Sequence, residues 1–452
     1  MKNVALHNLG CKVNSYEIEV MQQMLQEKGY NIVPFDEAAD IYIVNTCTVT
    51  NIADRKSRQM LHRAKQKNPD AVVVAVGCYV QTAGRKIEMD DSIDLAVGNN
   101  RKKDIVSILE QYLGERNKTL HDTTVMDMNQ PCEYEEMTLK RTAEHTRAYI
   151  KIQDGCNQFC SYCVIPYARG RVRSRRQEDV LAEIRGLVKA GYREAVLTGI
   201  HISSYGVDFE AGSGKSVYYS GSSKLVELVE RVHEIDGLDR IRLGSLEPRI
   251  VTGETAARLA ALPKLCPHFH LSLQSGCDAT LKRMNRHYTV EEYRRSVKAL
   301  RSVFDHPAIT TDVIVGFPGE TEEEFEETKS FLKETEFFEM HVFKYSRRAG
   351  TRAADMPEQI PSQVKNSRSS QLLALEKEQS KVFRSRCLGK EAEVLFEETK
   401  EIGGLFYRIG YTRDYVKIAV PVAAEAPLPN MLEKVMAEGF LTDEILLAKR
   451  NR

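Results

Sequence analysis

Gly155-Cys156-Asn157-Gln158-Phe159-Cys160-Ser161-Tyr162-Cys163 places three thiols within eight residues, with gaps of three and two residues between them. No fourth Cys or His lies nearby to complete the four-ligand set that a structural zinc site normally has. An iron–sulfur cluster bound by only three thiolates leaves one iron open to bind another molecule. The spacing therefore predicts such a cluster. A zinc site that takes a distant fourth ligand is the alternative.

Composition limits the kind of protein that carries this stretch. At 452 residues, the chain is long enough for about three domains. Its formal net charge is zero, so a nucleic acid must be bound by local basic patches. The sequence shows neither an export signal nor an apolar run of membrane-spanning length. Ten cysteines in such a chain predict a cytoplasmic protein with thiolate ligands, and no membrane partner.

Outside this stretch, the first 113 residues alternate between strand and helix patterns. Short apolar runs at 4–6, 41–44 and 72–76 are typical of buried parallel strands, and 17–28 and 53–67 have helical periodicity. This α/β alternation predicts an N-terminal doubly wound domain over residues 1–113.

Three further cysteines follow those predicted strands directly: Cys11, Cys47 and Cys78. Ligands of open α/β sheets gather beyond the carboxyl ends of the strands. We therefore expect these thiols to meet at one edge of the sheet and to form a second site with three sulfur ligands. Buried, unligated cysteines are the alternative.

The rest of the chain divides into a linker and two more domains. Residues 114–144 lose periodicity and are predicted to be a linker, and an α/β pattern with longer units fills 145–372. Its six predicted strands favour a partial (β/α)6 barrel with its chemistry at the strands' carboxyl ends; they lie at 148–152, 194–198, 240–244, 268–273, 310–315 and 339–344. Short alternating segments within 380–446 predict a small C-terminal β-barrel.

The cysteine motif Cys156-x3-Cys160-x2-Cys163, with Tyr162 before the last Cys, is similar to the signature of radical S-adenosylmethionine (SAM) enzymes. Together with Cys11, Cys47 and Cys78, it makes the chain resemble the methylthiotransferase family over nearly its whole length. The resemblance also includes Leu9 to Asn14, Asn45 to Thr50, Val76 to Cys78 and Ala168 to Arg175. It implies an N-terminal methylthiotransferase domain, a radical SAM core domain and a C-terminal TRAM domain.

The resemblance also implies cofactors and partners. They are two [4Fe–4S] clusters, one on each cysteine triad, and SAM, which binds the open iron of the core cluster and yields a radical on reduction. The radical activates carbon 2 of an adenine in tRNA, and the TRAM domain holds the anticodon arm. A reductant protein such as flavodoxin or ferredoxin and an unidentified sulfur donor complete the set.

The expected SAM contacts lie at successive strand ends of the predicted barrel. A Gly at such a position allows close approach of the backbone to the ligand. Ser245 and Glu247 are expected near the ribose, and Tyr162 near the adenine. The full expected set is Tyr162, Thr198, Gly199, Ser245, Glu247, Gln274, Val315 and Gly316.

Four alternate arginines, Arg169, Arg171, Arg173 and Arg175, follow the cysteine motif. Alternate residues of an extended segment point the same way. We therefore predict a row of guanidinium groups that binds RNA phosphates. A solvated or ion-paired segment is the alternative.

The branches of the family differ in substrate. Lys12-Val13, Thr48-Val49-Thr50 and Ala53 to Arg58 resemble the branch that acts on N6-threonylcarbamoyladenosine at position 37 of tRNA. The sister branches act on isopentenyladenosine in tRNA and on an aspartate of a ribosomal protein. An alternative of a different class is a non-catalytic iron–sulfur or zinc protein that binds RNA.

Overall fold

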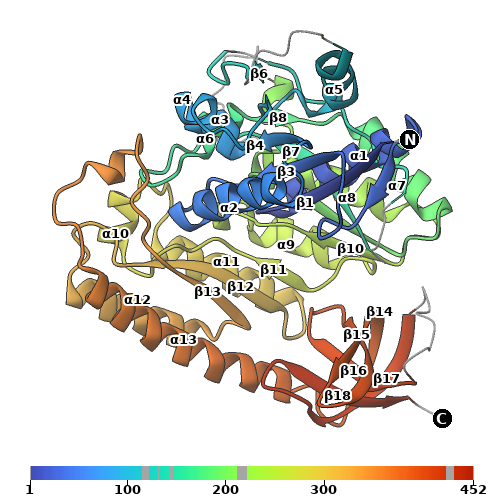
Figure 1. The fold of residues 1–452 in the computed structure, drawn as a ribbon. Coiled ribbons are helices and arrows are strands. Elements are labelled where there is room, and N and C mark those ends of the chain that lie inside the picture. Colours follow the sequence, from blue (N-terminus) through green and yellow to red (C-terminus); the bar gives the residue numbers. More distant parts are fainter. Residues whose placement is uncertain are drawn as a thin grey trace.

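The computed structural model describes residues 2–114, 122–130, 132–141, 147–210, 221–423 and 432–450. Figure 1 shows three units in chain order: an N-terminal α/β domain in blue, a central domain in green to orange and a small red β-barrel. Within the described ranges, we find no helix with the length and apolar character needed to cross a membrane.

The N-terminal domain is a doubly wound α/β domain, as predicted. Its strands are all parallel, in the order β2 (Asn31–Val33), β1 (Asn3–Asn8), β3 (Ile41–Thr46), β4 (Val72–Gly77), β5 (Leu95–Val97) and β6 (Asp122–Thr124). Every residue of β3 and β4 is buried because helices cover both faces of the sheet. The helical elements are α1 (Lys12–Glu27), α2 (Asn51–Lys67), α3 (Cys78–Ala83), α4 (Arg85–Glu88), η1 (Lys102–Asp104) and α5 (Ile105–Gly114).

The segment 114–144, which the sequence predicts to be a linker, is an integral part of the packing where it is described. Strand β6 adds to the sheet beside β5. Met137 and Leu139 are buried in the apolar cluster that also holds residues of α1 and of the first barrel strand. This segment therefore packs against both domains, in addition to linking them along the chain.

The central domain is a partial barrel. Its parallel strands are β7 (Arg147–Asp154), β9 (Glu194–Gly199), β10 (Arg240–Leu243), β11 (His268–His270), β12 (Ala308–Val315) and β13 (Glu339–Lys344). They form two sheets, β10-β9-β7 with the short antiparallel β8 (Arg173–Ser174) at its edge, and β11-β12-β13. Single bridges between 241 and 265 and between 246 and 271 connect the sheets. The barrel stays open between β7 and β13.

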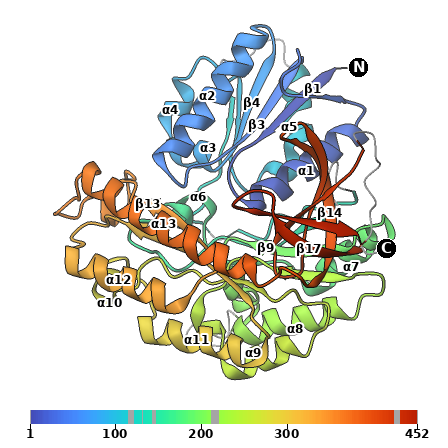
Figure 2. The ribbon, with the colours of Figure 1, turned by 90° about the horizontal axis from the view of Figure 1, so that it is seen from below.

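Helices cover the outside of this partial barrel, as Figures 1 and 2 show for α8, α9, α11 and α12. Thr289 and Thr321 form capping boxes at the start of α11 and α12 and satisfy backbone N–H groups there. The helical elements of the domain are α6 (Ile165–Arg169), α7 (Gln177–Lys189), η2 (Ile202–Ser204), η3 (Val207–Glu210), α8 (Gly221–His233), η4 (Pro248–Ile250), α9 (Gly253–Ala260), α10 (Asp278–Arg283), α11 (Val290–Val303), α12 (Glu322–Thr335) and η5 (Arg352–Ala354).

A long helix, α13 (Ser362–Ser385), leads from the partial barrel to the C-terminal domain and crosses the predicted boundary between the two. The C-terminal domain is a closed barrel of β14 (Glu391–Ile402), β15 (Leu405–Tyr411), β16 (Lys417–Pro421), β17 (Leu432–Phe440) and β18 (Ile445–Arg450). Buried Arg240 and Arg242 of β10 donate to its backbone carbonyls at Tyr411, Glu393 and Arg413. The small barrel is therefore anchored to the central domain by charged hydrogen bonds.

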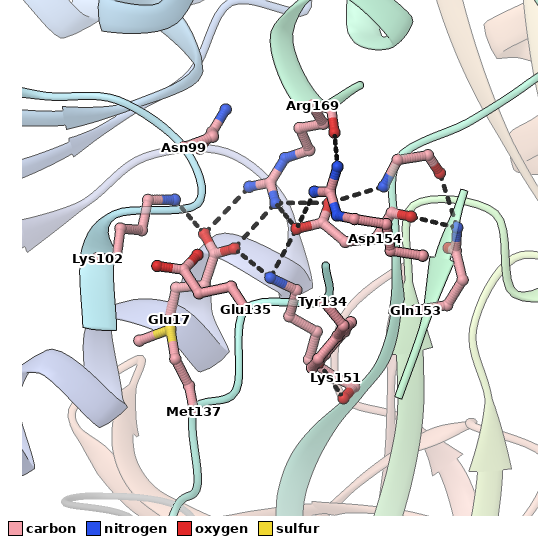
Figure 3. A network of polar contacts seen from close by, with 12 residues as sticks. Glu17, Asn99, Lys102, Tyr134, Glu135, Met137, Lys151, Gln153, Asp154 and Arg169 are labelled. Atoms are coloured by element: carbon pink, nitrogen blue, oxygen red, sulfur yellow. Dashed lines mark hydrogen bonds and ion pairs between the residues drawn. The ribbon is translucent and has the colours of Figure 1, made fainter. Parts of the chain in front are cut away.

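Arg169 of the central domain, at the end of α6, fixes the N-terminal domain in place. Its guanidinium is fully buried and lies 2.9 Å from Glu17 Oε1 and 3.1 Å from Asp154 Oδ1, and it donates to Asn14 Oδ1 at 2.7 Å. Glu17 and Asn14 belong to α1, whereas Asp154 ends β7. Figure 3 shows Arg169, Glu17 and Asp154 converging from the two domains. One cation therefore holds α1 against the first barrel strand.

The carboxylate of Glu17 forms ion pairs with three cations in this network. Lys102 and Lys151, both fully buried, pair with its two carboxylate oxygens. Burial alone would raise the pKa of Glu17, but Arg169, Lys102 and Lys151 together hold it well below its usual value. The carboxylate is thus charged inside the interface, where each charge has an opposite partner.

A second contact closes the opposite side of the open barrel. Arg348, which follows β13, reaches Asp54 Oδ2, Asn51 Oδ1 and Thr48 Oγ1 of the N-terminal domain, each at 2.7 Å. The Arg169 network binds the N-terminal domain beside β7, and Arg348 binds it beside β13. The N-terminal domain therefore spans the opening between the two edge strands.

Replacing Arg169 with Met should destabilise the protein by on the order of 3 kcal/mol, because Glu17 and Asp154 lose a buried cation. Scanning calorimetry of anaerobically purified protein measures the drop in Tm. Arg176→Met is the matched control, since Arg176 is exposed and pairs with Asp179 on the surface. Equal Tm values for the two variants would contradict this role of Arg169.

Candidate functional site

The first cysteine triad lies in the loop between β7 and α6, where the sequence places it. The loop is fixed by backbone bonds: Cys156 N donates to Gly170 O at 3.0 Å and Cys163 N to Cys160 O at 3.0 Å. Gly155 has a φ of +71°, and a Cβ there would lie 1.8 Å from the Arg171 carbonyl oxygen. Only glycine therefore allows the chain to turn into this loop.

N–H groups point at the sulfur atoms of this triad. Arg286 Nη1 lies 3.1 Å from Cys160 Sγ, and the Gln158 backbone N–H donates to Cys156 Sγ at 3.5 Å. Burial raises the pKa of Cys163 to about 12, and the neighbouring Cys160 thiol raises it too. Without a metal the Cys163 thiol is therefore protonated at neutral pH, so binding of iron there displaces a proton.

The second triad forms at one edge of the N-terminal sheet, as predicted. Cys11 follows β1 at the start of α1, Cys47 follows β3, and Cys78 follows β4 as the first residue of α3. Strands β1, β3 and β4 are neighbours in the sheet, so their carboxyl ends lie together. Burial, with smaller contributions from the thiols of Cys78 and Cys11, raises the pKa of Cys47 to about 11.

Close packing and polar contacts surround this second triad. A Cβ on Gly10, which has a φ of +106°, would lie 3.0 Å from Cys47 Sγ, so the loop before Cys11 comes very near that sulfur. Arg169 Nε lies 3.3 Å from Cys78 Sγ, and Asn99 Nδ2 lies 3.6 Å from it. The guanidinium that joins the two domains therefore also contacts a candidate cluster ligand.

Both triads fit iron–sulfur clusters better than a single metal ion. Sulfur ligands of one tetrahedral zinc lie about 3.8 Å apart, given Zn–S bonds of about 2.3 Å. Within the described residues, neither triad holds its three sulfur atoms within 4.8 Å of one another. Wider spacing suits a cluster of several irons, and N–H groups near the sulfurs tune its potential.

A cavity of about 640 Å³ lies between the N-terminal domain and the partial barrel. Cys11 lines it from the N-terminal side, and Thr198, Gly199 and Ser245 line it from the ends of β9 and β10. Tyr415 of the C-terminal barrel also contributes to its wall. A molecule in this cavity would touch all three domains.

The other expected SAM contacts lie outside this lining. Glu247 is buried and bound to Arg249 Nε at 2.7 Å and His201 Nε2 at 3.1 Å, beside a neighbouring cavity of about 510 Å³. Tyr162 packs edge-on against Phe317, with ring centroids 6.3 Å apart.

Val315 is the last residue of β12 and Gly316 follows it, whereas Gln274 lies four residues beyond the end of β11 at His270. Gln274 has a φ of +72°, and its backbone N–H donates to Asp312 O at 2.8 Å. The Gly316 N–H donates to Glu320 Oε1 at 2.8 Å. Their roles as SAM contacts stay predictions.

The predicted row of RNA-binding arginines is wrong for three of its four members. Arg169 ends a helix, so the segment is not extended throughout, and Arg169, Arg173 and Arg175 are buried. Arg175 pairs with Glu183, and Arg173 donates to Arg169 O at 2.9 Å. Arg169 and Arg175 also reach Glu17 and Tyr16 of the N-terminal domain, whereas Arg173 lies 3.6 Å from Asp154 within the central domain. The ion-paired alternative therefore holds for these three arginines.

Arg171 alone of the four is exposed, and its guanidinium lies 4.4 Å from the Phe159 ring centroid. Because Arg171 is exposed, its side chain is accessible to a partner from outside. Arg171 therefore remains a candidate for RNA contact.

Several polar residues of the cavity were missing from the sequence-based set. They are His268 and His270 of β11, Asp312 of β12 and His341 of β13. Strand periodicity places residues two apart on one side of a strand, but the sequence does not show which side faces the cavity.

Comparison with known proteins agrees with the fold. Residues 150–332 match the radical SAM superfamily, and residues 3–98 match the family described as uncharacterized protein family UPF0004. The radical SAM methyltransferase TsrM from Kitasatospora setae has the same fold, with a TM-score of 0.56 and 18% identity over 78% of this chain and 77% of its own.

Relatives with higher identity define the family. The chain is 42% identical to the threonylcarbamoyladenosine tRNA methylthiotransferase MtaB of Bacillus subtilis, over 98% of this chain and 96% of the relative. It is 34% identical to the tRNA-2-methylthio-N(6)-dimethylallyladenosine synthase of Desulfitobacterium hafniense, over 97% and 95% of the two chains. Fold and cysteine motif thus define a radical SAM enzyme. Within that class, the chain belongs to the methylthiotransferase family and is most like its threonylcarbamoyladenosine branch.

Replacing Arg286 with Met should lower the reduction potential of the cluster held by Cys156, Cys160 and Cys163. A cation beside Cys160 stabilises the more negative reduced state. A difference of about 1.4 kcal/mol between the redox states corresponds to about 59 mV. A redox titration followed by electron paramagnetic resonance measures the shift, with exposed Arg294→Met as control. An unchanged potential in Arg286→Met would refute this role.

Proposed function

We propose that this enzyme converts N6-threonylcarbamoyladenosine at position 37 of tRNA into its 2-methylthio derivative. The observation that carries this proposal is the shared cavity. Cys11 of one triad and the strand ends expected to bind SAM line the same space, so a substrate there lies between sulfur source and SAM. Relatives named for this reaction match nearly the whole chain.

The cofactors are SAM and two [4Fe–4S] clusters. Cys156, Cys160 and Cys163 would hold one cluster, and Cys11, Cys47 and Cys78 the other. When bound, the cluster on the Cys156 triad would supply the electron that cleaves SAM. The cluster on the Cys11 triad would carry the sulfur to be transferred. The protein's contribution is to hold the two triads in fixed positions, through Arg169 and Arg348.

The substrate base lies in a single-stranded loop, so it can leave its stack and enter a cavity. Arg171 and the C-terminal barrel, which we assign as a TRAM domain, would contact the anticodon arm. A tRNA substrate places the enzyme in the cytoplasm, where a flavodoxin or ferredoxin would supply electrons. The sulfur donor remains unidentified.

A second candidate substrate is isopentenyladenosine, because several relatives are named for it. The lining of the cavity favours the threonylcarbamoyl group. Lys12, Asp312 and three histidines reach the cavity, whereas an isopentenyl group would need an apolar wall.

Nucleoside mass spectrometry of tRNA from cells lacking this gene tests the substrate. We expect loss of the 2-methylthio form of threonylcarbamoyladenosine, while 2-methylthio-isopentenyladenosine stays at its normal level. The reverse pattern would exclude the proposed substrate.

Single cysteine substitutions test the roles of the triads. Cys78→Ala should halve the iron content and abolish methylthiolation, yet leave reductive SAM cleavage measurable, because the Cys156 triad is intact. Cys156→Ala should abolish both activities. Cys387→Ala, outside both triads, is the control. Iron analysis and 5′-deoxyadenosine release are the measurements. Loss of SAM cleavage in a folded Cys78→Ala protein would contradict this division of roles.

A further inference from the structure

One wall of the shared cavity is unusually polar. His268 and His270 occupy alternate positions of β11, Thr310 and Asp312 alternate positions of β12, and His341 lies on β13. Alternate residues of a strand point to the same side, so all five face the cavity. These side chains come from the barrel alone and are separate from the two cysteine triads.

Lys12 brings a positive charge to this wall from the N-terminal domain. It is the first residue of α1, directly after Cys11, and it lines the same cavity. Within the described parts of the chain, Lys12 makes neither a hydrogen bond nor an ion pair. Its charge nevertheless acts on His268 and His341, since it contributes to lowering the pKa of both.

His268 is a second group without a partner. It is only 6% exposed, and its Nδ1 has no hydrogen-bond partner among the described residues. Its ring packs against that of Tyr415, with the ring centroids 4.9 Å apart. A buried polar atom of this kind normally has a partner. Lys12 and His268 together therefore indicate a polar ligand in the cavity.

The charged groups around the cavity indicate whether that ligand is an anion or a cation. Arg242 is paired with Glu194 at 2.9 Å, and Arg147 with Glu397 at 3.0 Å. The acidic groups of the wall also have partners.

Asp312 lies 3.3 Å from His270 Nε2, and Glu339 lies 2.5 Å from Arg384. Among the described residues that line the cavity, Lys12 is then a cation without an opposite charge, and it favours an anionic group.

A metal ion is the competing ligand for this wall. His270, Asp312 and His341 bring their ligand atoms within 4.8 Å of one another, as a divalent cation requires. The unpaired ammonium of Lys12 reaches the same cavity and repels such a cation. The same charge attracts a carboxylate.

We propose that Lys12 binds the carboxylate of the substrate's threonyl group, while His268 and His341 offer imidazole nitrogens to its other polar atoms. This inference rests on the proposed function and names the residues that read the modification. A substrate with an isopentenyl group leaves Lys12 and His268 unpaired in the cavity. Such unpaired polar groups are how an enzyme rejects an analogue that lacks the hydrogen-bonding group.

The experiment compares two versions of one substrate. Anticodon stem-loop RNAs carry threonylcarbamoyladenosine either with its free carboxylate or as the methyl ester, which has no charge. Reconstituted wild-type enzyme should methylthiolate the acid with a kcat/KM about 10- to 100-fold above that of the ester, the range of a charged hydrogen bond. Lys12→Met should process acid and ester equally, and Lys12→Arg should restore part of the preference.

Control variants separate recognition from damage to the neighbouring cluster. Lys28→Met changes an exposed lysine just past the other end of α1 and should keep the wild-type preference. Iron content shows whether Lys12→Met keeps both clusters. If it does not, His341→Leu takes its place and should reduce the preference for the acid by at least about threefold.

The outcomes are distinct. If wild-type enzyme prefers the acid and Lys12→Met keeps that preference with both clusters present, Lys12 does not read the carboxylate. Equal wild-type rates for acid and ester also overturn the inference, but leave the proposed function intact. Wild-type activity on the isopentenyladenosine stem-loop alone defeats the proposed function itself. Activity that requires added zinc and disappears in His341→Leu favours the metal site.

Discussion

The guanidinium of Arg169 bonds to Glu17 and Asn14 of the N-terminal domain, to Asp154 at the end of β7 and to the sulfur of Cys78. The relative position of the two cysteine triads depends on this group. A flexible hinge between the domains would let the distance between the triads vary, whereas a buried cation with four partners does not. Lys102 and Lys151 balance the carboxylates, so the interface is charged yet closed to water. This constraint explains why an ion network occupies a place where apolar packing would be expected.

This interface covers the open side of the partial barrel. A closed barrel would fill its interior with side chains, but here β7 and β13 remain apart and the N-terminal domain spans the opening. The resulting cavity has walls from three domains, including Tyr415 of the C-terminal barrel. The cavity therefore exists only in the assembled chain, because no single domain supplies all of its walls.

Much of this arrangement could be predicted from the sequence, because it depends on patterns of residues that are close together in the chain. Cys11, Cys47 and Cys78 each follow a strand, and parallel strands bring their ends together whatever the details of packing. The six barrel strands could also be predicted, because short apolar runs separated by helical periodicity are typical of alternating strands and helices. The arginines after Cys163 show the limit. Their alternation indicated an exposed row. Arg169 is instead buried because it pairs with Glu17, which lies about 150 residues earlier in the chain. Partners that distant leave no local pattern, and the same holds for the histidines of the cavity wall.

The chain order of the Arg169 network has a consequence for biosynthesis. Arg169 lies 91 residues after Cys78, the sulfur that it contacts. While the ribosome is still making the central domain, the N-terminal sheet can fold, but Glu17 has only Lys102 beside it and Cys78 lacks its guanidinium. The polar surroundings of Cys78 are therefore complete only after α6 has been translated and Arg169 has reached the N-terminal domain.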